Sequence, residues 1–272
     1  MVIDMLIYPK VKIQYPIGLE REYARELVKY VRKVRDICKQ HIPAMVDAAM
    51  WNAIHADGWT EEQTEEIDKD ITAEEEAAIM AIILAMFNRV KTFNRRQQEN
   101  IFRSMFSATP KEISKEDYEK IRQIWVNQNI ELIHSIDRRT LESIRYALSE
   151  NIIRAVDRKI LIEELTESIM HMAEVNEKRA ALIACDQVGK LNSQLVQLEQ
   201  MSRGVEKYKW QTMEDGRVRK QHQSYNQKDF SWSEPPDGGH PGWSYRCRCT
   251  AIPLYDTDKI ALQPKAGSYK KV

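Results

Sequence analysis

The strongest constraint on this 272-residue chain is the distribution of its helix-breaking residues. The sequence contains nine glycines and nine prolines, which is few for its length, and they crowd toward the C-terminus. Proline lacks the amide hydrogen that a helix interior needs, and glycine costs about 1 kcal/mol there relative to alanine. We therefore expect a mostly α protein, with a long helical body followed by a small, loop-rich α+β module that contains cysteine and histidine.

Composition excludes several classes of protein. Hydrophobic residues make up 43% of the chain and charged residues 30%, with equal numbers of basic and acidic side chains. These values are typical of a folded soluble protein, and a net charge of zero gives no bulk attraction to DNA. Four cysteines are too few for a disulfide framework. The longest apolar run, Ala77 to Phe87, is too short to cross a bilayer, so we expect no membrane contact and synthesis in the cytoplasm.

The chain divides into four expected segments. Residues 1–17 are apolar and β-prone and predict an N-terminal arm, extended or a short strand, that docks on a neighbour. Residues 18–204 form the helical body. Residues 205–253 form the C-terminal module, and residues 254–272 form a tail.

Within the body, apolar residues recur every three or four positions, which predicts amphipathic helices. The first covers Glu20 to about Ile54, with a break or kink near His41 caused by Pro43. The second begins at a capping box formed by Thr72 and Glu75 and ends near Phe106, after an acidic connection over Asp57–Glu76. A third opens at Ser114. Ile152 to Met201 continues as one or two further helices.

The C-terminal module gathers the residues capable of site chemistry. Tyr208, Trp210 and Thr212 alternate with polar residues and predict a strand over Lys207–Thr212, and a second strand is expected over Arg248–Ile252. His222, His240, Cys247 and Cys249 are a possible tetrahedral zinc set. Their spacing fits neither a Cys-x2-4-Cys pair nor a His-x3-5-His pair. A second interpretation therefore stays open, in which the thiols are buried small hydrophobes and the histidines cap turns.

Several unusual short sequence motifs follow one another in this stretch. They are Trp210-x-Thr212, Asp215-x-Arg217-Val218-Arg219-x-x-His222, His240-Pro241, and Cys247-Arg248-Cys249 followed by Pro253; Arg179 to Ala184 and Gly204 precede them. Through these motifs the last third of the chain resembles the Mu-F-like minor head proteins, the phage head morphogenesis family of tailed bacteriophages. Residues 125–150 resemble the helix-turn-helix part of the same family. One departure is that five residues separate His240-Pro241 from Cys247, where the family often has a tight His-Pro-x-Cys-Arg-Cys run.

The resemblance implies a structural role. It implies a minor head protein made in the host bacterial cytoplasm and carried in the virion, in the head interior or at the portal vertex. The implied partners are the portal protein, the major capsid or scaffolding protein, and packaged DNA. The motif residues with an expected structural role are Trp210, Thr212, Asp215, Arg217, Arg219 and Arg248.

Two other functions are weighed against this role. Lys220, Arg246 and Trp243 are candidates for DNA contact, by phosphate pairing and base stacking, although the arginines of the module have Glu214, Asp215 and Asp237 as alternative partners. The module is alternatively a zinc-dependent hydrolase or nuclease, or an effector carried in the head. The sequence has no P-loop, nucleophile elbow or His-Glu-x-x-His, and we assign no catalytic residue.

Overall fold

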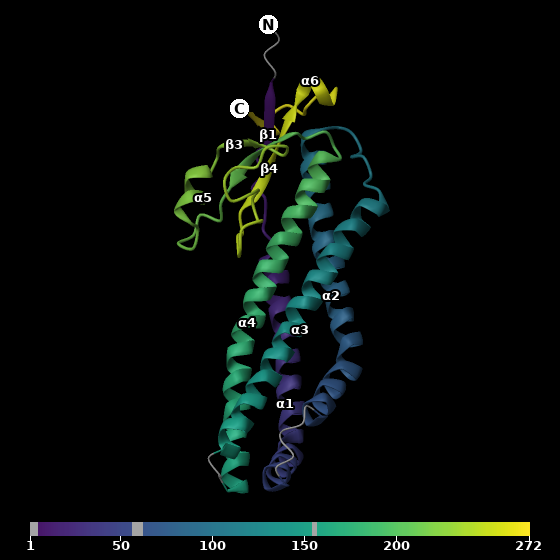
Figure 1. Ribbon diagram of the computed structural model, residues 1–272. Helices are drawn as coiled ribbons and strands as arrows, with labels where there is room; N and C mark the ends of the chain where they lie inside the picture. The colour runs from purple at the N-terminus through teal and green to yellow at the C-terminus, as the bar shows by residue number, and fades with distance from the viewer. Residues whose placement is uncertain (1–4, 56–61, 154–156) are drawn as a thin grey trace. The chain divides into compact units, whose positions relative to one another are not determined.

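The computed structural model describes residues 5–55, 62–153 and 157–272. Four long helices account for most of the chain: α1 (Ile17–His55), α2 (Glu62–Met105), α3 (Lys115–Ile153) and α4 (Arg158–Met201). A five-stranded antiparallel sheet, whose first strand precedes α1, and two short helices complete the described residues (Figure 1). The mostly α fold with a small C-terminal α+β part is confirmed.

The sheet contains both ends of the chain. Its strands are β1 (Leu6–Pro9), β2 (Lys207–Gln211), β3 (Asp229–Ser231), β4 (Thr250–Asp256) and β5 (Tyr269–Lys271), in the order β3-β2-β4-β1-β5. The short helices α5 (Lys220–Tyr225) and α6 (Thr257–Ile260) lie in the connections. Both strands expected in the module are present; the second, expected over Arg248–Ile252, begins two residues later and ends four residues later.

The N-terminal segment contains a short strand, as one of the two expectations had it, but the pairing of β1 corrects its expected docking on a neighbour. Ile7 is opposite Tyr255 of β4 on one side and Lys271 of β5 on the other. Both edges of β1 are therefore used within the chain, and the segment is not an arm free to dock on a neighbour. The expected tail is corrected as well, because β5 completes the same sheet.

The first helix does not break near His41, where Pro43 was expected to interrupt it. The helix α1 is continuous through Pro43, although proline in a helix interior costs about 3 kcal/mol. On either side of it, Cys38, Ile42, Met45 and Val46 are buried. Burying each such side chain contributes about 1.5–3 kcal/mol, which offsets the lost hydrogen bond.

Two other helix boundaries also differ from expectation. The helix α2 begins at Glu62, so Thr72 lies inside it rather than at its start. The acidic stretch is helical from Glu62 onward. Residues 56–61 lie outside the described part of the chain. Residues 125–150 are one uninterrupted part of α3 rather than a helix-turn-helix. The hydrophobic pattern located the helices but not their ends.

The chain forms two compact units, each assembled from separate segments. One comprises Met1–Glu20, Ala85–Trp125 and Cys185–Val272, and the other Arg21–Leu84 and Val126–Ala184. The expected boundary at residue 205 therefore does not separate compact units, because the ends of α2 and α4 are grouped with the sheet. We call the first the sheet unit and the second the helical unit.

Each unit has an apolar core crossed by a few polar pairs. In the helical unit, the Tyr30 hydroxyl donates to Asp137 at 2.5 Å and the Tyr23 hydroxyl to Asn129 at 2.8 Å. In the sheet unit, Asn94 donates to the side chain of Asn192 at 2.8 Å. Buried polar groups stabilise a fold only when paired in this way, so these pairs fix the register of the helices that carry them.

One segment passes a length and composition test for a membrane span. Among the described residues this is Ala77–Met105, which makes up 29 of the 44 residues of α2 and extends to its C-terminal end. Its apolar side chains Ile83, Phe87 and Val90 are buried within the protein, as are the polar Asn94 and Gln98. Only 33% of the apolar window is buried, and Ala77, Ala78 and Ala81 are exposed, so Ala77–Phe87 buries one face rather than every side as the sequence suggested.

We predict that β1 is essential to the sheet unit. Ile7 is fully buried against Phe102, Phe106 and Tyr255, so Ile7→Ala should lower the free energy of unfolding by about 2–5 kcal/mol. Val11→Ala is the control, because Val11 is about half exposed. Thermal or urea unfolding measures both, and equal small effects would show that β1 is only loosely attached.

Candidate metal centre

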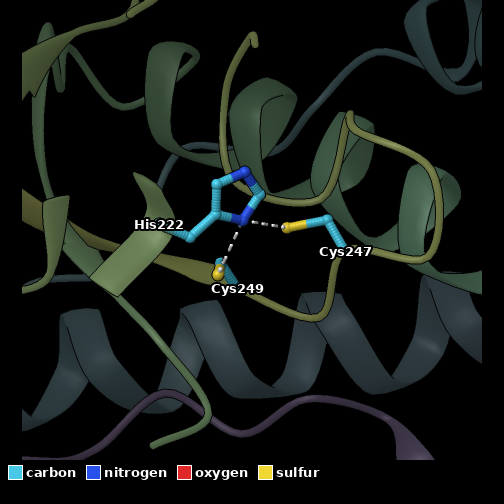
Figure 2. Close-up of side chains that lie close together, drawn as sticks. All are labelled: His222, Cys247 and Cys249. Carbon is cyan, nitrogen blue, oxygen red and sulfur yellow. Dashed lines mark hydrogen bonds between the residues drawn. The ribbon is translucent and has the colours of Figure 1, made fainter. Parts of the chain in front are cut away.

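The site is built on a loop and a strand that meet beside α5. His222 lies in α5, Cys247 in the loop before β4, and Cys249 directly before β4 begins. All three side chains are at most 4% exposed. They form the group of close potential metal ligands among the described residues, with ligand atoms all within 4.8 Å of one another (Figure 2). We call it the His-Cys-Cys cluster.

Both sulfur atoms approach the same ring nitrogen. His222 Nδ1 lies 3.4 Å from Cys247 Sγ and 3.7 Å from Cys249 Sγ, and Figure 2 shows the two contacts converging on it. In a tetrahedral zinc site, with Zn–S of about 2.3 Å and Zn–N of about 2.0–2.1 Å, a nitrogen and a sulfur ligand are about 3.5–3.6 Å apart. The observed distances bracket that value, so the three atoms fit a tetrahedral ion.

The two thiols have pKa values shifted in opposite directions. Hydrogen bonds from Cys249, His222 and the Gly242 amide lower the pKa of Cys247. The hydrogen bond to Cys247 and burial raise the pKa of Cys249. A thiolate is the metal-binding form of cysteine, so the surroundings of Cys247 favour that form, and Cys249 would release its proton on binding.

His240, the fourth expected ligand, lies elsewhere. Its Nδ1 is 2.9 Å from the Tyr208 hydroxyl, and its ring packs 4.8 Å from Trp232 and 4.9 Å from Trp243. Burial lowers the pKa of His240, which favours a neutral ring in this aromatic pocket. The prediction that His240 joins the cluster is therefore wrong, and the cluster has three protein ligands.

The expected motif residues surround the cluster. Trp210, in β2, packs its ring edge-on to His222 at 5.3 Å. Arg248 donates two hydrogen bonds to Asp215, at 3.0 and 2.8 Å, and Arg217 lies 3.5 Å from the same carboxylate. These bonds hold the pKa of Asp215 below its usual range. The ion pair links the loop after β2 to the Cys-Arg-Cys segment.

Two further motif residues bind backbone groups near the cluster. Arg219 donates to the carbonyl of Tyr245 at 2.5 Å. Thr212 is buried, and its amide donates to the Asn226 side chain at 3.0 Å. Most of the motif therefore maintains the shape of one loop system.

The candidates for DNA contact fall on the surface near this loop system. Lys220 and Arg246 are exposed and Trp243 is 43% exposed. The Arg246 side chain hydrogen-bonds to Cys185, and its amide donates to Asp186 at 2.9 Å. Arg217 and Arg248 both pair with Asp215. The sequence had offered this pairing as the alternative to DNA contact.

Two glycines that sequence reasoning missed seat the cysteine loop on α4. A Cβ at Gly189 of α4 would lie 2.8 Å from the Cys247 carbonyl oxygen. A Cβ at Gly242 would lie 2.7 Å from the Cβ of Ser193, whose hydroxyl donates to the Pro241 carbonyl. The available signal was a single glycine inside a helical pattern, because such a residue usually has a packing reason.

Known proteins agree with the motif assignment. A family model described as Phage Mu protein F like protein matches the C-terminal part of the chain from residue 147 to residue 252. Residues 147–252 are similar to that family. This confirms the resemblance drawn from the short sequence motifs, and Arg179 to Cys249 all fall inside the matched region.

One relative and the absence of a structural match complete the comparison. An uncharacterized protein of Haemophilus influenzae is 36% identical over 132 residues, which cover 48% of this chain and 29% of that protein. The chain therefore spans less than a third of this relative's length. No solved structure matches the chain.

We predict that the close approach at Gly242 is required for the site. Gly242 has φ +92°, so alanine there is strained and also collides with Ser193 and the Gly189 carbonyl. Gly267→Ala is the matched control, because Gly267 has φ +78° with open space around it. Gly242→Ala should cost about 1–3 kcal/mol more in unfolding free energy than the control. Equal losses would mean that backbone strain alone matters.

Proposed function

We propose that this chain is a minor head protein of a tailed bacteriophage, acting in head morphogenesis and docked at or near the portal. The observation that carries the proposal is the Phage Mu F-like match over residues 147–252. A protein of this kind would be made in the bacterial cytoplasm and carried in the virion. Its partners would be the portal protein and the major capsid or scaffolding protein.

The long helices supply the surface that we assign to the portal contact. In the helical unit, Tyr146, Ile160 and Val175 are 66%, 47% and 43% exposed. Exposed apolar side chains on helices suit packing against partner helices. The loops around the cysteines use their residues for internal bonds, so we assign the main contact to the helices.

One triple variant and one double variant test this assignment. In Tyr146→Ser/Ile160→Ser/Val175→Ser, incorporation into purified phage heads should fall at least about tenfold, since each lost contact removes roughly 1 kcal/mol or more at a well-packed interface. The matched control is Trp243→Ser/Tyr245→Ser, whose side chains are also exposed. Mass spectrometry of heads gives the copy number for each.

Measuring copy number in purified heads tests the proposed function and the assigned contact surface separately. Absence of the unchanged chain from purified heads would contradict the proposed function. Normal incorporation of the triple variant, with loss in the double variant, would move the contact to the sheet unit.

We further propose that the His-Cys-Cys cluster holds zinc and fixes the cysteine loop. The donor set, with one nitrogen and two sulfurs, is one that zinc accepts, and the distances suit a tetrahedral ion. Zinc bound here would replace the proton of Cys249, so its binding free energy would stabilise the loop. The loop also has an aromatic core, formed around Tyr208, Trp210 and Trp232, so the metal adds to that packing.

Metal analysis of protein purified without a histidine tag tests the zinc assignment. We expect one zinc ion per chain. Cys247→Ser and Cys249→Ser each remove a direct ligand. Each should therefore lower zinc affinity by more than the roughly 10–100-fold lost when a residue that only supports a ligand is removed. Cys185→Ser is the control, because its thiol lies outside the cluster. Metal-free parent protein, with all three variants equally protease-resistant, would contradict the assignment.

One observation favours a second function, a zinc-dependent hydrolase. Because His240 is occupied elsewhere, the cluster offers three ligands, and catalytic zinc sites keep a fourth position open. Zinc supplies Lewis-acid chemistry at such a position. Incubation of zinc-loaded protein with plasmid DNA, with and without a chelator, distinguishes this function, and intact plasmid in both arms would exclude nuclease activity.

A further inference from the structure

A small pocket opens beside the His-Cys-Cys cluster and is bordered by arginines. Its lining contains the three candidate ligands, the apolar Met213 and Val218, and four arginines: Arg217, Arg219, Arg246 and Arg248. We call these four the arginine rim. The pocket volume is about 20 Å³, and a cavity needs roughly 10–15 Å³ to hold one water molecule. The space therefore suits one small ligand atom next to the cluster.

The charge of the arginine rim is only partly balanced. Arg248 and Arg217 share the single carboxylate of Asp215. Arg219 donates to a neutral carbonyl, and Arg246 hydrogen-bonds to the Cys185 thiol. Among the described residues, no carboxylate lines the pocket itself; outside the lining, Asp186 accepts the Arg246 amide and Glu20 acts on the charge of Arg248. The lining residues alone therefore carry an excess of positive charge.

A bound metal would not cancel this excess. A divalent ion with two thiolates and a neutral imidazole has no net charge, so the surrounding arginines determine the sign of the field at the fourth position. Guanidinium groups match phosphate oxygens in geometry and bind them through charge-assisted hydrogen bonds. The exposed ends of Arg217 and Arg219 are available for the part of such an anion that does not fit inside.

We propose that the arginine rim binds a phosphate group, with one oxygen in the pocket at the open side of the metal. This inference rests on the proposed metal site and goes beyond it by naming the ligand. The phosphate is either a free oxyanion or a phosphodiester of nucleic acid. The pocket admits a single oxygen in both cases, so the chemistry of recognition is the same.

Cobalt in place of zinc makes the fourth position visible, because its absorption bands respond to the ligands around it. The full chain loaded with Co²⁺ is titrated with inorganic phosphate, and separately with a thymidine tetranucleotide that lacks terminal phosphates, at constant ionic strength. We expect a saturable change in the bands with inorganic phosphate. A change with the tetranucleotide too would extend the ligand to phosphodiesters, and a change with phosphate alone would restrict it to free oxyanions.

Two basic residues of the same unit provide a matched pair of variants. Arg219→Gln removes a charge from the pocket lining and should weaken phosphate binding about tenfold, as expected for one charge-assisted hydrogen bond. Lys228→Gln removes a charge from a residue that is exposed but does not line the pocket, and should leave affinity unchanged. Bands of both variants in the absence of phosphate should match the parent, which shows that the metal site is intact.

The outcomes separate this inference from the metal proposal. Bound cobalt whose bands respond to neither probe would overturn phosphate binding and leave the metal site standing. Equal weakening in Arg219→Gln and Lys228→Gln would also overturn it, because binding would then reflect overall charge. A chain that takes up no Co²⁺ would overturn both proposals.

Discussion

The candidate site depends on how closely the cysteine loop approaches α4. A helix with a side chain at position 189 would leave no room for the Cys247 carbonyl, and a loop with one at position 242 would collide with Ser193. With glycine at both places, backbone meets backbone, and the Asp186 carboxylate accepts the Arg246 amide at 2.9 Å nearby. The positions of Cys247 and, two residues later, Cys249 follow from this contact, because the loop is held on both sides of the first thiol.

The sheet extends this contact to the ends of the chain. The strand β4 continues directly from the cysteine loop, and it pairs with β2 on one side and β1 on the other. Gln211 strengthens this arrangement by donating to the Ile13 carbonyl at 2.7 Å and to the Thr250 hydroxyl at 3.0 Å. Residues almost 200 positions apart in sequence are thereby fixed around one strand. The site accordingly lies in a unit with a substantial core, rather than in an isolated segment of about fifty residues that needs a metal to fold at all.

The sequence predicted features that depend on local pattern and missed those that depend on distant partners. Helical periodicity located the four helices, and the alternation around Tyr208 and Trp210 located β2. The continuity of α1 through Pro43 was missed, because burial on both sides of the proline outweighs its local cost. The pairing of β1 with β4 and β5 was also missed, because an apolar, β-prone segment carries no information about which strand it will meet.

The cluster shows the same limit at the scale of single atoms. Four potential ligands in one stretch suggested a closed Cys2His2 site, since composition counts ligands without direction. The structure separates the two histidines: His222 faces the thiols, while His240 is enclosed by Tyr208, Trp232 and Trp243. A closed site is saturated and serves stability alone, whereas three ligands leave one coordination position for a molecule from outside. The aromatic enclosure of His240 therefore has a chemical consequence at the cluster: a tetrahedral ion held by the other three residues would take its fourth ligand from outside this set.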